Sequence, residues 1–243
     1  MPFVLFHVFA IIILKWEEKL APYLSYLFLI FGALTCYFDF LTTETLVFTV
    51  PMTIIVCLRI RDGRFDTLKK GFWTTVEYGL YWLFGYAVFY PIKWALASLM
   101  TGESTFAYSL QRMMQRTDNF DMAENATHLD TFVSSVGRLF PFTLFSNGRS
   151  ILYSCILIGV VYIIAWVYFR RKRIPPCAWI LSGIMLLPYL RGVLLANHTI
   201  VHSFMVFRAQ LGTMMALFAF SSMTMVWKEE KTVIKSGKKG HRR

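Results

Sequence analysis

The side chains with the clearest chemical potential lie in the stretch from Ala196 to Arg208, between two long apolar runs. This stretch carries Asn197, two histidines four residues apart at His198 and His202, and then Arg208 inside the next apolar run. Ionisable groups at membrane depth are costly and are usually retained for a function. The pattern therefore favours a site that holds a phosphate or a sugar hydroxyl.

The two histidines have a spacing that places them on one face of a helix. Such a pair can bind a metal, but no Asp or Cys stands nearby in the sequence, so we predict neither a metal site nor a cofactor. A structural role is the alternative, in which the histidines hydrogen-bond at a helix start that Asn197 or Thr199 caps.

Three cations are predicted at the same membrane level as this stretch, namely Lys93, Arg191 and Arg208. Each could extend its long side chain to the interface and do nothing more. Three cations from three different helices nevertheless favour phosphate, because the planar fork of Arg binds two of its oxygens. The predicted ligand is a lipid-linked phosphate or diphosphate. Its predicted contacts are Lys93, Arg191, Asn197, His198, His202 and Arg208.

Asp39 is the candidate catalytic residue, at the end of a Tyr-Phe-Asp string. Burial beside aromatic rings raises the pKa of a carboxyl group towards the range in which it can act as a general base. An ion pair with Lys93 or Arg208 is the structural alternative.

The composition indicates a membrane protein. Of the 243 residues, 56% are hydrophobic and 16% are charged, whereas about a quarter of a soluble domain is charged. The apolar residues form blocks, as bilayer-spanning helices do. The sequence predicts an all-α, polytopic transmembrane helix bundle of about seven spans, at 2–14, 20–41, 44–60, 74–100, 149–169, 177–196 and 203–227.

The basic residues predict the orientation of the bundle. The connectors 15–19, 59–70 and 170–173 and the carboxyl-terminal tail hold 18 of the 25 Lys and Arg residues. The positive-inside rule then places the amino terminus outside and the carboxyl terminus in the cytoplasm. Because these charges lie at span ends, the net charge of +11 does not indicate nucleic-acid binding.

We expect two domains: a transmembrane bundle at 1–227 with an extracytoplasmic loop at 101–148, and a disordered basic cytoplasmic tail at 228–243. Within the loop, Ser104–Gln115 is expected to form an amphipathic helix. The first apolar run is short and has no basic residues before it, which predicts that the chain is a piece of a longer protein. Motifs for ATP hydrolysis, serine hydrolysis and dinucleotide binding are absent from the sequence.

Three strings, Phe31–Thr43, Gly85–Trp94 and Ala196–Arg208, together resemble the carboxyl-terminal half of polytopic bacterial membrane proteins. Those proteins are similar to the C-type membrane glycosyltransferase superfamily. The resemblance implies a polyprenyl-phosphate-linked sugar donor at the outer face of the bacterial plasma membrane, for cell-envelope polysaccharide or glycan assembly.

In that superfamily the catalytic acid usually lies in the first outer loop, and a long loop follows it. Here a very short turn follows Asp39, and the chain is expected to start after that first loop. An upstream or partner membrane subunit is therefore expected. A transporter or flippase of a polar or lipid-linked solute, and a non-catalytic membrane subunit, are the alternatives.

Overall fold

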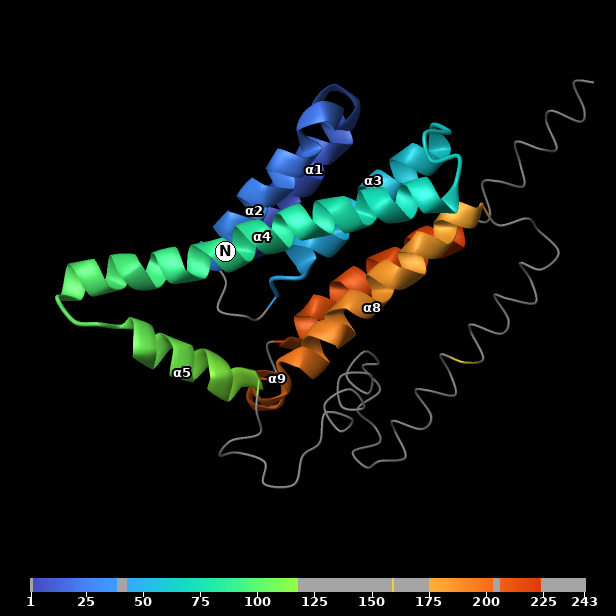
Figure 1. Ribbon diagram of the computed structural model, residues 1–243. Helices are drawn as coiled ribbons and strands as arrows, with labels where there is room; N and C mark the ends of the chain where they lie inside the picture. Colours follow the sequence, from blue (N-terminus) through green and yellow to red (C-terminus); the bar gives the residue numbers. More distant parts are fainter. Residues whose placement is uncertain (1, 39–42, 118–158, 160–174, 203–205, 224–243) are drawn as a thin grey trace, which may run out of the picture.

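The computed structural model describes residues 2–38, 43–117, 159, 175–202 and 206–223. All regular elements in these residues are helices, which confirms the predicted all-α fold. Three helical stretches in them are long and apolar enough to cross a membrane: Phe3–Phe38, Leu68–Thr101 and Pro176–Leu194. The arrangement is shown in Figure 1.

The first of these stretches is a helical hairpin. Helix α1 (Pro2–Leu20) is followed by the short 3₁₀ turn η1 (Ala21–Tyr23) and by α2 (Leu24–Phe38). The prediction that 15–19 is a connector is wrong, because these residues form the end of α1. Lys and Glu are good helix formers, so α1 continues through them, and the chain turns at η1, where Pro22 has no backbone N–H to donate.

Helix α3 (Leu46–Arg61) forms the centre of the structure. Most of its side chains are buried, and it contacts α1, α2, α4 and α8. It contains Pro51, and interior prolines are common in helices that lie in membranes. The helix matches the predicted span at 44–60 closely.

Helix α4 (Leu68–Thr101) is the longest helix and begins six residues before the predicted span at 74–100. Thr67 caps its start, since the hydroxyl oxygen accepts a hydrogen bond from the Lys70 backbone N–H at 3.3 Å. Gly102 ends it with a φ of 71°, a conformation that glycine adopts without strain. Large apolar side chains along α4, such as Leu80 and Phe84, are left uncovered by the described residues.

The remaining described helices are α5 (Phe106–Thr117), η2 (Pro176–Ala178), α8 (Trp179–Leu194), α9 (Ala196–Val201), η3 (Phe207–Ala209) and a helix at 210–223. Among them, α5, η2 and α8 contact α3 or α4, α9 contacts α5 and α8, and the helix at 210–223 runs along α8 (Figure 1). The predicted amphipathic helix is thus α5, shifted by two residues. Helix α8 matches the predicted span at 177–196. The predicted span 149–169, apart from residue 159, and the predicted tail 228–243 lie outside the described residues.

Helices α8 and 210–223 pack antiparallel to one another. The Thr213 hydroxyl donates to the Met185 carbonyl oxygen at 2.9 Å, and the Trp179 and Phe220 rings lie 5.4 Å apart. Early residues of one helix thus contact late residues of the other. The same order of contacts is expected for two consecutive membrane spans joined by a short turn.

The tightest packing in the described structure joins α2 to α4. A Cβ atom built on Gly32 would lie 2.1 Å from the Trp82 carbonyl oxygen, and one on Gly85 would lie 2.1 Å from the Leu29 carbonyl oxygen. Each glycine thus lets its helix touch the backbone of the other. Small residues at helix crossings serve this purpose in membrane bundles.

Replacing Gly85 with Ala is expected to destabilise the protein by about 1–3 kcal/mol or more, since the added methyl group meets backbone that cannot move aside. Thermal unfolding of the purified protein in detergent measures the effect. Gly183→Ala is the matched control, because a Cβ there meets nothing within 4 Å. Equal unfolding temperatures for the two variants would contradict the role of the crossing.

Candidate functional site

A buried ion pair lies at the start of α3. The Arg191 Nε donates to Glu44 Oε1, and their side chains are only 8% and 4% exposed. Glu44 precedes α3, whereas Arg191 lies in the last turn of α8. The pair therefore joins two helices that are distant in sequence. Removing two charges from water costs free energy, and here the attraction between the two opposite charges offsets that cost.

The same guanidinium group also binds a side chain of α9. Arg191 Nη1 donates to the Thr199 hydroxyl oxygen at 3.1 Å. The planar fork of Arg thus contacts α3 through one nitrogen and α9 through another. Arg191 holds the corner between α8 and α9 against the start of α3.

Helix α9 is also tied to α5. Asn197 Nδ2 donates to the backbone carbonyl oxygen of Gln115 at 2.6 Å, near the carboxyl end of α5. Figure 1 shows the end of α5 lying close to α9. Asn197 was expected to bind ligand or to cap a helix, and the structure shows it as a link between two helices.

The two histidines share a face, as their spacing predicts. Their ring centroids are 4.6 Å apart with an angle of 51° between the rings. His198 is buried, while His202 is half-buried. A group that approached this face from outside would meet His202 first.

Lys93 reaches the carboxyl end of α2. Its Nζ donates to the Cys36 carbonyl oxygen at 3.4 Å, within the last turn of that helix. A cation is favoured there by the partial negative charge of the helix end. Tyr90, one turn earlier on α4, lies close enough to Glu44 and Arg116 to interact electrostatically with both. Helices α4 and α5 therefore border the same polar region as α3, α8 and α9.

The other two predicted site residues, Arg208 and Asp39, are not part of this group of contacts among the described residues. Arg208 lies in η3 and is exposed. Asp39, the candidate catalytic acid, lies outside the described residues. The structure thus brings together Arg191, Asn197, His198 and His202 and places Lys93 at the nearby end of α2.

Glu44 is the residue of this site that sequence reasoning missed. It is not among the candidate site residues that the sequence predicts. The sequence did contain a signal that could have found it. Arg191 lies inside a predicted span, a buried arginine requires an anion, and Glu44 is an acid at the boundary of another span.

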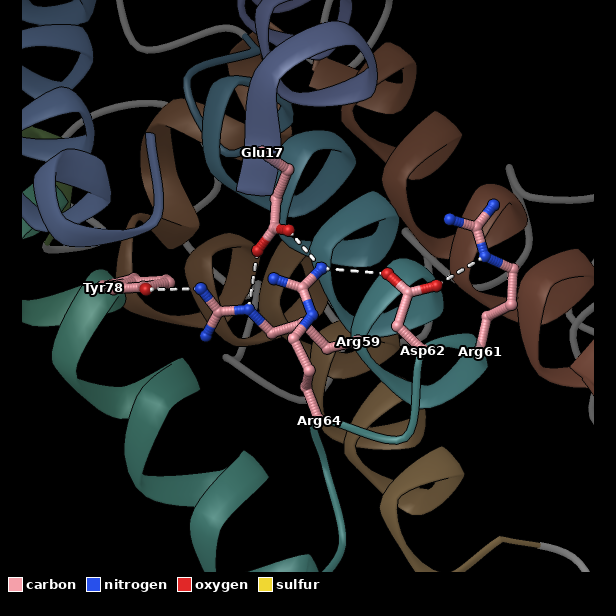
Figure 2. Close-up of polar contacts among 6 residues, drawn as sticks. All are labelled: Glu17, Arg59, Arg61, Asp62, Arg64 and Tyr78. Atoms are coloured by element: carbon pink, nitrogen blue, oxygen red, sulfur yellow. Dashed lines mark hydrogen bonds and ion pairs between the residues drawn. The ribbon is translucent and has the colours of Figure 1, made fainter. Parts of the chain in front are cut away.

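A second buried charge cluster lies at the opposite end of α3, about 22 Å away at the 1.5 Å rise per residue of a helix. Figure 2 shows Glu17 of α1 facing two arginines. Glu17 Oε1 accepts from Arg59 Nε at 2.7 Å, and Oε2 accepts from Arg64. Arg59 also donates to the Tyr78 hydroxyl oxygen at 2.9 Å. The cluster joins α1, α3, the following loop and α4.

The outer part of this second cluster is exposed. Asp62 accepts from Arg61 at 2.8 Å and from Arg64 at 3.0 Å. The hydrogen bond from Arg61 is the main cause that lowers the pKa of Asp62, and the bond from Arg64 acts in the same direction. Asp62 thus stays ionised and keeps Arg64 oriented towards Glu17.

No three His, Cys, Asp or Glu side chains come together as a possible metal site within the part of the chain that the structure describes. Comparison with known protein families, with curated proteins and with solved structures gives no match for this chain. The fold and the site therefore define a general class of protein. It is an all-helical protein with helices that can cross a membrane and with a buried charge cluster at each end of its central helix.

Glu44→Gln is expected to lower the free energy of unfolding by about 3–5 kcal/mol, because it leaves the Arg191 guanidinium buried without its carboxylate. The double variant Glu44→Leu with Arg191→Met removes both charges and is expected to cost less than either Glu44→Leu or Arg191→Met alone. Chemical unfolding in detergent measures all of them. Additive losses in the double variant would contradict a coupled pair.

Glu17→Gln is expected to cost a similar amount, about 3–5 kcal/mol, since two arginines then lose one shared anion. Asp62→Asn is the matched control, because its contacts are exposed and such pairs contribute about 0–1 kcal/mol. If both variants unfold at the same denaturant concentration, Glu17 is not the centre of the cluster.

Proposed function

We propose that this chain is a multi-pass membrane protein whose less basic end holds the phosphate of a lipid-linked sugar, as part of a glycosyltransferase site at the extracytoplasmic face. The observation that carries the proposal is the buried contact of Arg191 with Glu44 and Thr199. It fixes a short helix that presents Asn197, His198 and His202 at one end of the bundle.

Two contacts support a common basic side. Glu17 meets Arg59, which brings the end of α1 at 15–19 and the basic segment 59–70 to the same end of the bundle. The Cys177 thiol donates to the Phe65 carbonyl oxygen at 3.4 Å, which brings the start of α8 to that end as well. The basic run 170–173 directly precedes this start in the sequence. This agrees with a cytoplasmic basic side and an outer polar side.

Within the proposal the predicted ligand residues take different roles. Arg191 and Asn197 are positioning residues, because their polar atoms bind Glu44, Thr199 and the Gln115 backbone. Arg208, which is exposed, and His202, which is half-buried, contact the phosphate or the sugar. Lys93 adds positive charge from the α2–α4 side, and Cys36, which it contacts, precedes Asp39 by three residues.

Asp39 is proposed as the general base that would activate the acceptor hydroxyl. A base in this position would take the proton of the acceptor as its oxygen attacks the sugar carbon, while the lipid phosphate departs. The cations near the polar end would stabilise the negative charge that builds up on the departing phosphate.

Polyprenyl phosphate binding by the protein in nanodiscs tests the proposal. Arg208→Gln is expected to weaken binding about tenfold or more, as hydrogen bonds to charged groups contribute about 1.5–3 kcal/mol. Arg61→Gln, an exposed arginine at the basic end, is the control and leaves binding unchanged. Absence of binding by the unaltered chain would refute the proposal.

A second candidate is a non-catalytic membrane subunit. It is favoured by the closed contact of Arg191 with Glu44, since a guanidinium engaged in this way stabilises helix packing. This function predicts that substitutions at Arg208 and His202 change thermal stability at most and that no polyprenyl phosphate is bound.

A further inference from the structure

A groove of about 850 Å³ runs between α4 and α8 near their amino ends. Helix α4 lines it with one face from Leu68 to Gly79, and α8 lines it with one face from Trp179 to Leu187. Phe48 of α3 contributes as well. Both helices begin at the basic end of the bundle, so the groove starts there and continues towards the middle of the structure.

Two glycines leave the groove open. A Cβ on Gly183 would meet nothing within 4 Å, and one on Gly79 would reach no closer than 3.4 Å to the Phe48 ring. Glycine in a helix interior costs about 1 kcal/mol relative to alanine. Close packing explains Gly71, where a Cβ would lie 2.4 Å from Ile180 Cδ1. Close packing does not explain Gly183. A ligand that occupies the space beside Gly183 would explain the absence of a side chain there.

The dimensions of the groove fit an acyl chain. From Leu68 to Gly79 a helix rises about 16 Å, which is close to half of a hydrocarbon core about 30 Å thick. The volume of the groove, about 850 Å³, leaves ample room for an extended hydrocarbon chain of this length.

The chemistry of the groove changes at its basic end. Lys69 is the charged residue among those that line it, and nearly all the others are apolar. Phe72 and Trp179 lie at the same end and are 52% and 40% exposed. Aromatic side chains prefer the headgroup level of a bilayer, and lysine there attracts anionic headgroups.

We infer that this groove binds one acyl chain of an anionic phospholipid from the leaflet on the basic side, with the lipid phosphate at Lys69. The inference rests on the membrane location proposed above, but not on the sugar-transfer activity. The apolar lining holds the chain, the two glycines provide its room, and Lys69 selects the charge of the headgroup.

Native mass spectrometry of the detergent-purified protein, titrated with phosphatidylglycerol or phosphatidylcholine, tests the inference. The unaltered chain is expected to bind phosphatidylglycerol more tightly. Lys69→Gln is expected to reduce this preference about fivefold, the effect of one lysine near an anionic surface. Lys70→Gln is the matched control, because Lys70 pairs with Asp66 at 3.6 Å and does not line the groove.

Gly183→Leu places a large side chain in the groove at a position where a Cβ meets nothing within 4 Å, and it is expected to weaken binding of both lipids while circular dichroism shows an unchanged helix content. Equal binding of the two lipids by the unaltered chain, or unchanged binding in Gly183→Leu, would overturn the inference. So would a groove that binds no lipid because the apolar segment 149–169 occupies it. Failure of the protein to insert into liposomes would instead contradict the membrane location itself.

Discussion

The close approach of α2 and α4 at Gly32 and Gly85 is the constraint on which the other features of the structure depend. Because each glycine lies against the backbone of the other helix, the two axes cannot separate or rotate without losing this contact. The position of α4 then brings Tyr78 to Arg59 near one end and Lys93 to the Cys36 carbonyl near the other. The same helix also forms one side of the apolar groove.

The two buried charge clusters add specificity to this packing. Charges taken out of water are stable only with their counterions in good geometry, so a rotated or shifted α3 would leave Glu17 or Glu44 buried without a cation. Each cluster joins elements that the chain separates widely: Glu17 and Arg59 at one end, Glu44 and Arg191 at the other. Together they set the depth and rotation of α3 relative to α1 and α8.

The two clusters differ in the polar side chains that lie around them. At the basic end, the arginines bind the carboxylates of Glu17 and Asp62 and the Tyr78 hydroxyl, which is a structural arrangement. At the other end, the ion pair is the support of α9, and the side chains presented there include a histidine pair and the exposed Arg208 nearby in sequence. A rigid support under reactive side chains is the arrangement expected of a binding site.

Sequence reasoning predicted most of the helices, including those that match α3 and α8, because hydropathy and helix propensity are properties of short segments. It was wrong about 15–19 because charged residues such as Lys and Glu can continue a helix beyond its apolar part. It also could not choose the partner of Arg191. Asp39, Glu44 and other acids are equally plausible by composition, and the choice depends on how helices rotate against one another.

By itself, then, the sequence determined that the chain is helical and strongly apolar and that its basic residues are gathered at segment ends. The tertiary structure decided which acid meets which base, that Asn197 binds the α5 backbone, and that a groove opens beside Gly183. The physical reason is the distance along the chain over which each property is set. Apolar burial is set residue by residue, whereas ion pairs and grooves depend on distances between helices that are far apart in the sequence.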